Sequence, residues 1–600
     1  MFRQRIGRLA AGLAGTLAVA ASLGAAGAAA KACPNTSTQT VSGSPSYTYT
    51  RGCIVSYDGT AIVYNLFEPL HPAAGSVYPI MIGPGWGSAG DTSPDPNLIS
   101  QGYAELTWDP RGFGQSGGVA EVDAPYAEGR DASALIDQVV TGRPEMATDQ
   151  CGDKGQPRYA NDTEASRTCG QPVVGMTGGS YGGGIQFATA AFDQRVKAIV
   201  PVITWNNLNW SLWPNSVIKL GWGELLYGAG LAEQAAEHGQ ADVNTGAITS
   251  GNPFSGGDGG MQIGGYDPMI HYSEVTGATL GFPDHTTMAW FGQRSMAVYG
   301  AGSAGHLPHI PTLLEQGTVD TLFNLNDAWN NYLLLKSHDS DVPVKLIAFC
   351  GGHVSCPTGA PPSGAGYSDT SSSSSPVGAG QSAGQFDENQ TLAWFNHYLK
   401  GQGPNDGMPA RVVYQDQTGD YHPLRTFPTV DRPGPASLVS APVSGTLVDH
   451  NAPSGAGPVG VDTAVTDGAT NAGDPGQVTV PVFTARTDTP VVGIGRVTGN
   501  VTVNGAATEL FFRLVDQNTG DVLDLQTTPL RVDNLDQQNL GTSAHPPASQ
   551  PFSVDLPGVA YKLPKGDTLE LQVSTSTNSF TANRGSAVIQ LSGTIKVPTL

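Results

Sequence analysis

The sequence predicts an α/β fold, in which a mostly parallel sheet is covered by helices, interrupted by a helical insertion and followed by a β-sandwich. Three observations predict it. Short apolar runs alternate with helical patterns over the first four hundred of the 600 residues, a tryptophan-rich segment interrupts this alternation, and the helical period disappears after about residue 411. Alternating strands and helices are typical of a parallel sheet with helices on both faces.

The N-terminus has the features of an export signal. Three arginines within the first eight residues precede an uncharged, alanine-rich run at 9–30. A membrane anchor is the alternative, but the run is poor in large apolar residues and an Ala-x-Ala-like site lies near 28–32. We therefore expect residues 1–32 to be a cleaved signal peptide and the protein to be secreted. Lys31 and Ala32 do not fit a lipobox before Cys33, so lipidation is not expected.

Cysteine usage agrees with an oxidising compartment. Six cysteines can pair in fifteen ways, and the simplest pairing closes three short sequential loops, 33–53, 151–169 and 350–356. No Cys-x-x-Cys pair with matching histidines is present, so neither a zinc site nor another metal or cofactor is expected. The cysteines are Cys33, Cys53, Cys151, Cys169, Cys350 and Cys356.

Charge and hydropathy exclude two classes of partner. The net charge of −22 lacks the basic footprint that nucleic-acid binding requires. No segment after the signal is apolar enough to span a membrane, so we expect a soluble mature protein. Its remaining length implies roughly two to four domains. Nothing in the sequence assigns an oligomeric state.

The expected sheet begins with antiparallel strands. Residues 38–66 alternate between apolar and polar positions, as half-buried strands do. Helical patterns at 124–140, 322–336 and 386–400 separate a further set of short apolar runs, and Gly401 ends the last helix. We expect the buried strands of the parallel sheet at 77–82, 103–108, 173–177, 196–203, 310–316 and 342–349.

Residues 205–306 are too many for a simple connection between two strands. They include five tryptophans, a helical stretch at 223–238 and a glycine-rich piece at 251–265. We interpret this segment as a helical cap inserted over the active site; a helical decoration that only packs is the alternative. The catalytic domain would then comprise residues 33–204 and 307–405.

The C-terminal third reads as a separate β-sandwich at 411–600, because short β-type runs recur there at turn-bounded intervals. A low-complexity segment at 357–384 is expected to be a surface loop. The β-type runs are 478–483, 490–497, 508–515, 522–525, 568–573 and 587–595.

The pentapeptide 178–182 (Gly-Gly-Ser-Tyr-Gly) carries the strongest chemical signal. It lies between the apolar run 173–177 and a small-residue helical segment at 183–191. That is the layout of a nucleophile elbow, in which a serine hydroxyl is exposed on a sharp strand-to-helix turn that only small neighbours permit. An ordinary glycine turn is the alternative in a chain with 79 glycines. We interpret Ser180 as a nucleophile.

A serine nucleophile needs a histidine base and a carboxylate that orients the histidine, and on this fold they follow the serine in the order acid, then histidine. Asp320 comes directly after the run 310–316 and before a helix. Capping of that helix is the alternative role for Asp320, and Glu315 and Asp327 are rival acids.

His353 is the expected general base because it follows the last strand of the sheet, within Cys350-Gly-Gly-His-Val-Ser-Cys356. A 350–356 disulfide would restrain this loop. The expected oxyanion donors are the backbone N–H of Tyr181 and an N–H from the loop after strand 77–82, from Gly85, Trp86 or Gly87. A simple turn is the alternative for that loop.

Five motifs carry a resemblance to a known family. They are 109–118 (Asp-Pro-Arg-Gly-Phe-Gly-Gln-Ser-Gly-Gly), 178–182, 317–320 (Gly-Thr-Val-Asp), 352–353 (Gly-His) and 560–571. Together they resemble the X-prolyl dipeptidyl peptidase family, whose other main branch is the cocaine-esterase-like acyl esterases. The resemblance implies an α/β-hydrolase domain, a helical cap and a C-terminal jelly roll, with Ser180 as nucleophile, Asp320 as acid and His353 as base. One departure is that the first oxyanion loop has no tyrosine, whose hydroxyl often donates to the oxyanion in that family. Asp109 and Arg111 are read as structural.

We expect a secreted serine hydrolase that forms an acyl-enzyme and acts on a peptide or small ester. An X-prolyl dipeptidyl-peptidase-like peptidase is favoured, and an acyl esterase is the first alternative. A dipeptidyl peptidase must bind a free α-amino group, for which the cap offers Glu224, Glu233, Glu237 and Asp242. A catalytically dead secreted binding protein is the alternative from another class.

Overall fold

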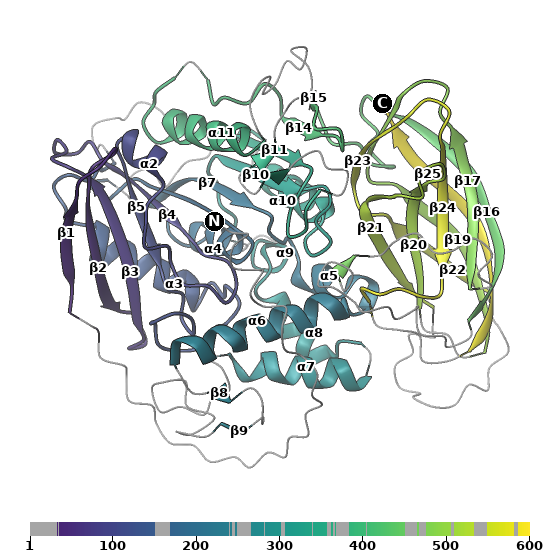
Figure 1. Cartoon of the computed structure of the whole chain (residues 1–600), viewed down its shortest axis with the longest axis horizontal. Helices are drawn as coiled ribbons and strands as arrows, with labels where there is room; N and C mark the ends of the chain where they lie inside the picture. The colour runs from purple at the N-terminus through teal and green to yellow at the C-terminus, as the bar shows by residue number, and fades with distance from the viewer. Residues whose placement is uncertain are drawn as a thin grey trace.

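The computed structural model contains a catalytic α/β domain, a cap and a β-sandwich, as expected (Figure 1). It describes residues 33, 35–149, 169–238, 241–242, 247–248, 266–280, 282–301, 306–338, 340–356, 362–363, 366–367, 383–403, 405–449, 465–466, 476–505, 509–532, 549–580 and 586–600. The expected signal peptide, Cys151 and the glycine-rich piece 251–265 lie outside these residues. None of the described helices is long and apolar enough to cross a membrane.

An eleven-stranded sheet forms the centre of the catalytic domain, in the order β1-β2-β3-β5-β4-β6-β7-β10-β11-β14-β15. The first three strands are antiparallel, as the alternation at 38–66 predicted, whereas β5 through β14 run parallel. The strands are β1 (Ser37–Val41), β2 (Tyr47–Val55), β3 (Ala61–Pro69), β4 (Tyr78–Ile82), β5 (Tyr103–Trp108), β6 (Val174–Gly179), β7 (Val196–Val202), β10 (Thr312–Gly317), β11 (Val344–Phe349), β14 (Val412–Gln415) and β15 (Tyr421–Leu424).

Helices cover both faces of this sheet. Residues of α3, α4 and α10 pack with one set of strand side chains, and residues of α2 and α11 pack with the other. Each apolar face is thereby removed from water, which is the main stabilising contribution of such a layered fold. The helices are α2 (Pro96–Ser100), α3 (Glu128–Leu135) continued by the π-helical turn Ile136–Val140, α4 (Tyr181–Ala190), α10 (Leu325–His338) and α11 (Ala383–Tyr398).

The insertion between β7 and β10 is mainly helical and lies below the sheet in Figure 1. Its aromatic side chains join those of the catalytic domain in one apolar cluster that includes Tyr181, Trp205, Trp222, Tyr266 and Phe323. The cap therefore covers the region of the predicted elbow. Its elements are α5 (Leu208–Leu212), the 3₁₀ turn Pro214–Ser216, α6 (Leu220–His238), β8 (Ala241–Asp242), β9 (Ala247–Ile248), α7 (Pro268–Leu280), α8 (His285–Gly292) and α9 (Met296–Tyr299). The short strands β12 (Pro362–Ser363) and β13 (Gly366–Tyr367) pair with each other.

The C-terminal domain consists of two antiparallel sheets around a core of valine, leucine and isoleucine side chains. One sheet has the order β22-β19-β25-β18-β23, with β16 paired to β25, and the other has the order β17-β24-β20-β21. The strands are β16 (Ser437–Asp449), β17 (Gln477–Thr484), β18 (Thr489–Gly493), β19 (Arg496–Gly505), β20 (Glu509–Asp516), β21 (Val522–Arg531), β22 (Gln550–Asp555), β23 (Val559–Leu563), β24 (Thr568–Ser574) and β25 (Ala587–Thr599).

The two strands that directly follow the boundary expected at residue 411 pair with the central sheet. β14 pairs in parallel with β11 and β15 pairs with β14, so residues 412–424 extend the catalytic sheet, and the sandwich begins with β16. A short β-type run has the same sequence pattern whether it is the last strand of one sheet or the first strand of the next. Only the pairing with β11 places this run in the central sheet.

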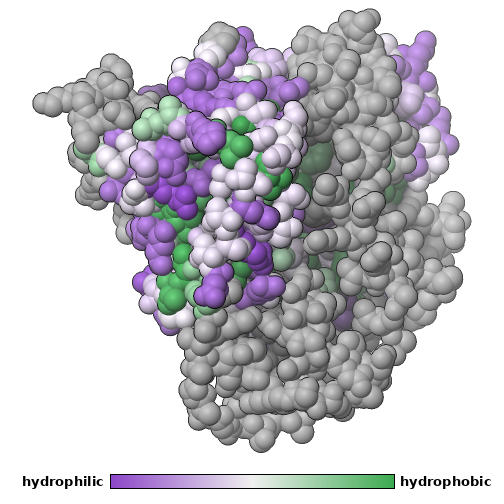
Figure 2. All heavy atoms as spheres, turned by 60° about the vertical axis from the view of Figure 1, so that its left-hand side comes forward, coloured by the Kyte–Doolittle hydropathy of each residue, from purple (hydrophilic) through white to green (hydrophobic). Residues whose placement is uncertain are grey.

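The face that carries the first three strands is mixed in polarity. In Figure 2, hydrophobic residues are interspersed among hydrophilic ones over the described part of this face. Val55 and Tyr57, at the end of β2 and in the turn after it, are among the exposed apolar side chains. Single apolar residues of this kind are normal on a protein surface and do not by themselves mark a docking site.

Candidate active site

Ser180 occupies a strained turn between β6 and α4. Its backbone has φ 59° and ψ −117°, a conformation that is unfavourable for a residue with a side chain. Gly178 before it also has a positive φ of 137°. This turn presents the serine at the carboxyl end of a parallel strand and at the N-terminus of a helix, as the Gly-x-Ser-x-Gly pattern predicted.

The glycines around Ser180 are needed because other backbone lies against them. A Cβ atom on Gly182 would lie 2.0 Å from the carbonyl oxygen of Gly83, and one on Gly178 would lie 2.5 Å from the same oxygen. On the next turn, a Cβ on Gly184 would lie 2.3 Å from the ring of Trp205. The loop after β4 is therefore packed directly against the elbow, where the prediction placed its second oxyanion donor.

Three predicted side chains form one chain of hydrogen bonds. His353 Nε2 lies 2.8 Å from Ser180 Oγ, and His353 Nδ1 lies 2.7 Å from Asp320 Oδ2. Because an aspartate oxygen can only accept from Nδ1–H, Nε2 is the nitrogen free to accept the serine proton. The residues come from β6, β10 and β11, which the sheet order brings to one edge.

Asp320 is held in place by its own loop. Its Oδ1 accepts from the backbone N–H groups of Leu322 and Phe323, both at 3.0 Å, while Oδ2 also accepts from the backbone N–H of His353 at 3.2 Å. The side chain is completely buried. One oxygen of the carboxylate thus holds the loop before α10, and the other orients the imidazole. The helix-capping role considered as an alternative is wrong, because α10 begins only at Leu325 and its first turn is bound by Asn324, which accepts from the backbone N–H of Asn326.

Aromatic rings enclose the imidazole of His353. The rings of Trp222 on α6 and of Phe323 meet it edge-on, with centroid distances of 5.6 and 5.3 Å. Ser180 is only 8% exposed. Charge that develops on the serine and the histidine is therefore poorly screened by water, so fixed dipoles act on it strongly.

One of the predicted oxyanion donors lies at the start of α4. Tyr181 is the first residue of α4, and the amide of a first helical residue has no acceptor within its helix. The indole N–H of Trp86, by contrast, donates to the carbonyl of Leu226 in the cap at 3.0 Å. The indole N–H of Trp86 is thus already bonded to the cap, which leaves the backbone N–H groups of Gly85, Trp86 and Gly87 as candidates for the second donor.

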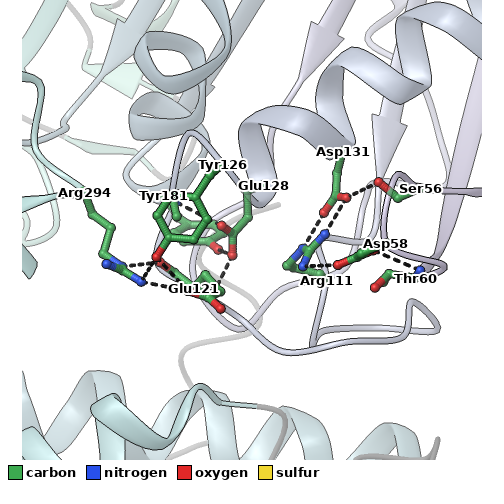
Figure 3. A network of polar contacts seen from close by, with 11 residues as sticks. Ser56, Asp58, Thr60, Arg111, Glu121, Tyr126, Glu128, Asp131, Tyr181 and Arg294 are labelled. Atoms are coloured by element: carbon green, nitrogen blue, oxygen red, sulfur yellow. Dashed lines mark hydrogen bonds and ion pairs between the residues drawn. The ribbon is translucent and has the colours of Figure 1, made fainter. Parts of the chain in front are cut away.

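The side chain of Tyr181 is anchored behind the elbow by a buried carboxyl (Figure 3). Its hydroxyl donates to Glu128 Oε1 at 3.1 Å, and Glu128 also accepts from the backbone N–H groups of Glu121 and Ala124. Burial raises the pKa of Glu128 to about 7. The neighbouring Asp123 is buried too, and burial raises its pKa well above the usual range. Glu128 was not predicted, since nothing in its sequence context separates it from an ordinary helix-start acid.

The Asp-Pro-Arg-Gly motif is structural, as predicted. Arg111 binds Asp131 through two hydrogen bonds of 2.7 Å and also contacts Asp58 at 3.0 Å (Figure 3). Asp109 accepts from the backbone N–H groups of Gly90 and Gln115. Both residues fix the loops that follow β4 and β5, and neither contacts the serine–histidine pair.

The rival acids lie elsewhere. Asp327 accepts from the backbone N–H of Asn206 and from the hydroxyl of Ser211, and so holds the base of the cap. Glu315 accepts from Thr391 under α11, and burial raises its pKa to about 8. Neither carboxylate contacts His353.

Glu224, one of the cap carboxylates considered for binding an α-amino group, is exposed. It lies about half a turn from Trp222 and Leu226, which face the active site, and so points away from it. The other three candidates, Glu233, Glu237 and Asp242, have side chains outside those that the structure describes.

Two of the predicted disulfides are present. Cys33 pairs with Cys53 between the first strands, and Cys350 pairs with Cys356 on either side of His353. Cys169 is also disulfide-bonded, while Cys151 lies outside the described residues. The buried Cys350–Cys356 pair closes the loop that carries the imidazole.

A possible metal-ligand group occurs only away from these residues, within the part of the chain that is described. Asp416, Asp420 and His422 have ligand atoms within 4.8 Å of one another in the β14–β15 hairpin. Asp416 already accepts from the N–H and hydroxyl of Thr418, and His422 Nε2 lies 3.0 Å from it. These contacts account for the hairpin without an ion.

Comparison with known proteins identifies both halves of the chain. Residues 58–355 match the family of X-Pro dipeptidyl-peptidases (S15 family), and residues 409–587 match the X-Pro dipeptidyl-peptidase C-terminal non-catalytic domain. A search of curated protein sequences finds no match.

Several solved structures share the fold over almost the whole chain. An α-amino acid ester hydrolase has 14% identity and a TM-score of 0.62, covering 92% of this chain and 97% of that one. An aminopeptidase from a marine sediment Thaumarchaeota archaeon has 15% identity and a TM-score of 0.60, covering 92% and 96%. A CocE/NonD family hydrolase from Staphylococcus aureus has 13% identity and a TM-score of 0.56, covering 92% and 94%. At these identities the likeness concerns the fold alone.

Proposed function

The chain belongs to the X-Pro dipeptidyl-peptidase (S15) family of hydrolases, and on that premise we propose that it is a serine hydrolase in which Ser180, His353 and Asp320 form the catalytic triad. The observation that carries the proposal is the unbroken chain of hydrogen bonds from Ser180 through His353 to Asp320. The strained backbone of Ser180 costs stability, and a protein that only binds its ligand does not need a serine hydroxyl 2.8 Å from an oriented imidazole.

The proposed reaction proceeds through an acyl-enzyme. Ser180 Oγ attacks the carbonyl carbon of the substrate while its proton passes to His353 Nε2, and the carbonyl oxygen becomes an oxyanion. His353 then gives this proton to the leaving amine or alcohol as the bond to the carbonyl carbon breaks. Water then attacks the acyl carbon while its proton passes to His353 Nε2. As the bond between this carbon and Ser180 Oγ breaks, His353 returns the proton to Oγ, which releases the acid and free Ser180.

The surroundings support each charge that develops. Asp320 stabilises the imidazolium of His353 without taking its proton, because its other contacts are backbone N–H donors. The backbone N–H of Tyr181 and one from Gly85, Trp86 or Gly87 would bind the oxyanion. Removing one such donor typically lowers the rate by ~10²–10³-fold.

Two substrate classes remain in the proposal. Family membership favours a peptidase that removes an N-terminal X-Pro dipeptide. Ester hydrolysis is the second candidate, since the apolar cluster of cap and elbow side chains suits an apolar acyl group. We also propose that residues 1–32 direct the chain out of the cell, where its disulfides persist.

Two assays test this proposal. Glycyl-prolyl-p-nitroanilide and p-nitrophenyl butyrate are hydrolysed side by side, and cleavage of the ester alone would overturn the peptidase assignment. A fluorophosphonate probe should label the folded protein, and the label should be lost in Ser180→Ala together with ~10⁴-fold or more of the turnover. A folded wild-type protein that is neither labelled nor active would be a binding protein instead.

A further inference from the structure

The loop that carries Asp320 is contacted by a side chain from the C-terminal β-sandwich. Gln526 on β21 donates its side-chain amide to two backbone carbonyls of this loop, to Thr318 at 2.8 Å and to Asp320 at 3.0 Å. Gln526 is 4% exposed and follows Asp320 by 206 residues. One side-chain amide thus binds the backbone of the catalytic acid itself from another domain.

The backbone of β21 is irregular directly before Gln526. Asp524 and Leu525, directly before it, both have a left-handed conformation, with φ of 50° and 58°. Neither is a glycine, so both residues are in a conformation that is strained for a residue with a side chain. The pairing between β20 and β21 shifts register over the same stretch. Irregularities of this kind re-aim side chains, and they recur next to active sites.

Asp524 holds this irregular stretch in place. Its buried carboxyl accepts from the backbone N–H of Ala560 at 2.6 Å, which ties β21 to β23 of the other sheet. This contact therefore helps to fix the backbone from which the side chain of Gln526 extends.

The same loop is contacted from the cap and from a second C-terminal segment. Lys219, which is buried, donates to the carbonyl of Leu322 at 2.8 Å. The hydroxyl of Thr321 donates to the carbonyl of Val465 at 2.8 Å and accepts from the indole of Trp222 at 3.0 Å. The contacts of Gln526 differ from these because they reach the carbonyls of Thr318 and Asp320, on the strand side of the acid.

We propose that Gln526 is a positioning residue that holds the Asp320 loop in register with His353, so that the C-terminal domain takes part in catalysis through this one side chain. The inference rests on the proposed triad. Asp320 makes its contacts to His353 at 2.7 and 3.2 Å, and a shift of its backbone moves both contacts together. Without Gln526 the two buried carbonyls lose their donor, and the loop must move to find another.

The test compares Gln526→Leu with Gln417→Leu. Gln417 is a matched control because it also joins the catalytic sheet to the sandwich through two backbone contacts, both with Lys562 at 2.8 Å, but away from the acid loop. We expect Gln526→Leu to lower kcat by ~10–100-fold with KM within about twofold, since a misplacement of ~1 Å costs up to ~10²-fold. Gln417→Leu should leave kcat within about twofold, even where both variants lower Tm equally.

A milder variant and a readout without substrate complete the experiment. Gln526→Asn keeps the amide but is one methylene too short to reach both carbonyls. Its kcat should lie between those of the wild type and Gln526→Leu, so it tests the proposal even where Gln526→Leu does not fold. The far-downfield proton resonance of the His353–Asp320 hydrogen bond should shift or broaden in both Gln526 variants and stay unchanged in Gln417→Leu.

The outcomes separate the two proposals. An unchanged kcat and an unchanged resonance in folded Gln526 variants would overturn the positioning role, as would equal losses in the Gln417 control. If the wild-type protein is inactive but the resonance responds only to the Gln526 variants, the positioning role stands and the proposed function is the part that fails.

Discussion

Replacing Asp320 by asparagine tests the triad at its most constrained position. Asp320 Oδ1 accepts from the backbone N–H groups of Leu322 and Phe323, so the amide oxygen of an asparagine must take that place. Its NH₂ group then faces His353 Nδ1, where Asp320 Oδ2 had accepted at 2.7 Å. An NH₂ group cannot accept from Nδ1–H. The imidazole must therefore move its proton to Nε2, the nitrogen that has to receive the proton of Ser180.

The expected loss follows from this change of tautomer. An enzyme whose histidine holds its proton on the wrong nitrogen loses ~10⁴-fold in kcat, which corresponds to about 5.5 kcal/mol of transition-state stabilisation. Because both residues have the same shape, KM and Tm should change little. Initial rates with the ester and peptide substrates, and the rate of fluorophosphonate labelling, should fall together.

Asp327→Asn is the matched control, since Asp327 is a buried acid of the same region that bonds to Asn206 and Ser211 instead of to His353. This variant should keep kcat within about tenfold of the wild type. An Asp320→Asn protein that is folded and retains more than a tenth of the wild-type kcat would refute the tautomer argument and return the choice of acid to its rivals.

Two further predictions concern the histidine loop and the sheet. Replacing both cysteines of the Cys350–Cys356 disulfide by serine should lower kcat by roughly tenfold or more, because the loop that carries His353 becomes more mobile. Circular dichroism checks that the variant is folded, and the same replacement at Cys33–Cys53 is the control. Equal values of kcat in the wild type and both variants would contradict the prediction. Burial raises the pKa of Glu105 on β5 to about 8, above its unfolded value, so the native state retains a proton there and stability falls as the pH rises from about 4.5 to 8. Glu105→Gln should therefore match the wild type in urea denaturation near pH 4.5 and exceed it by ~3–5 kcal/mol above pH 8, and a constant difference at both pH values would contradict the assignment.

The residues of the proposed triad could be selected from the sequence because each of them meets a local requirement. A serine at positive φ in this turn needs small residues two positions before and two positions after it, and Gly178 and Gly182 meet that requirement. Asp320 and His353 each follow directly after an apolar strand, and parallel strands deliver their carboxyl ends to one edge of the sheet. The strand periods and the order of the three residues along the chain therefore sufficed to select them.

Other features exist only as contacts between residues far apart in the chain. β14 and β15 belong to the catalytic sheet because β11 offers them a partner, although their sequences fit either domain. The indole of Trp86 is committed to the carbonyl of Leu226, 140 residues later, which no local pattern announces.

The anchor of Tyr181 on Glu128 and the contact of Gln526 with the acid loop have the same character. A single glutamine or glutamate in a strand or helix has many possible partners, and its sequence neighbours do not select among them. Packing selects the partner, since a buried amide or carboxyl that is left without one costs more free energy than the local chain can recover. The residues of the proposed triad could therefore be read from the sequence, whereas the contacts that hold their loops in place are determined by the tertiary structure.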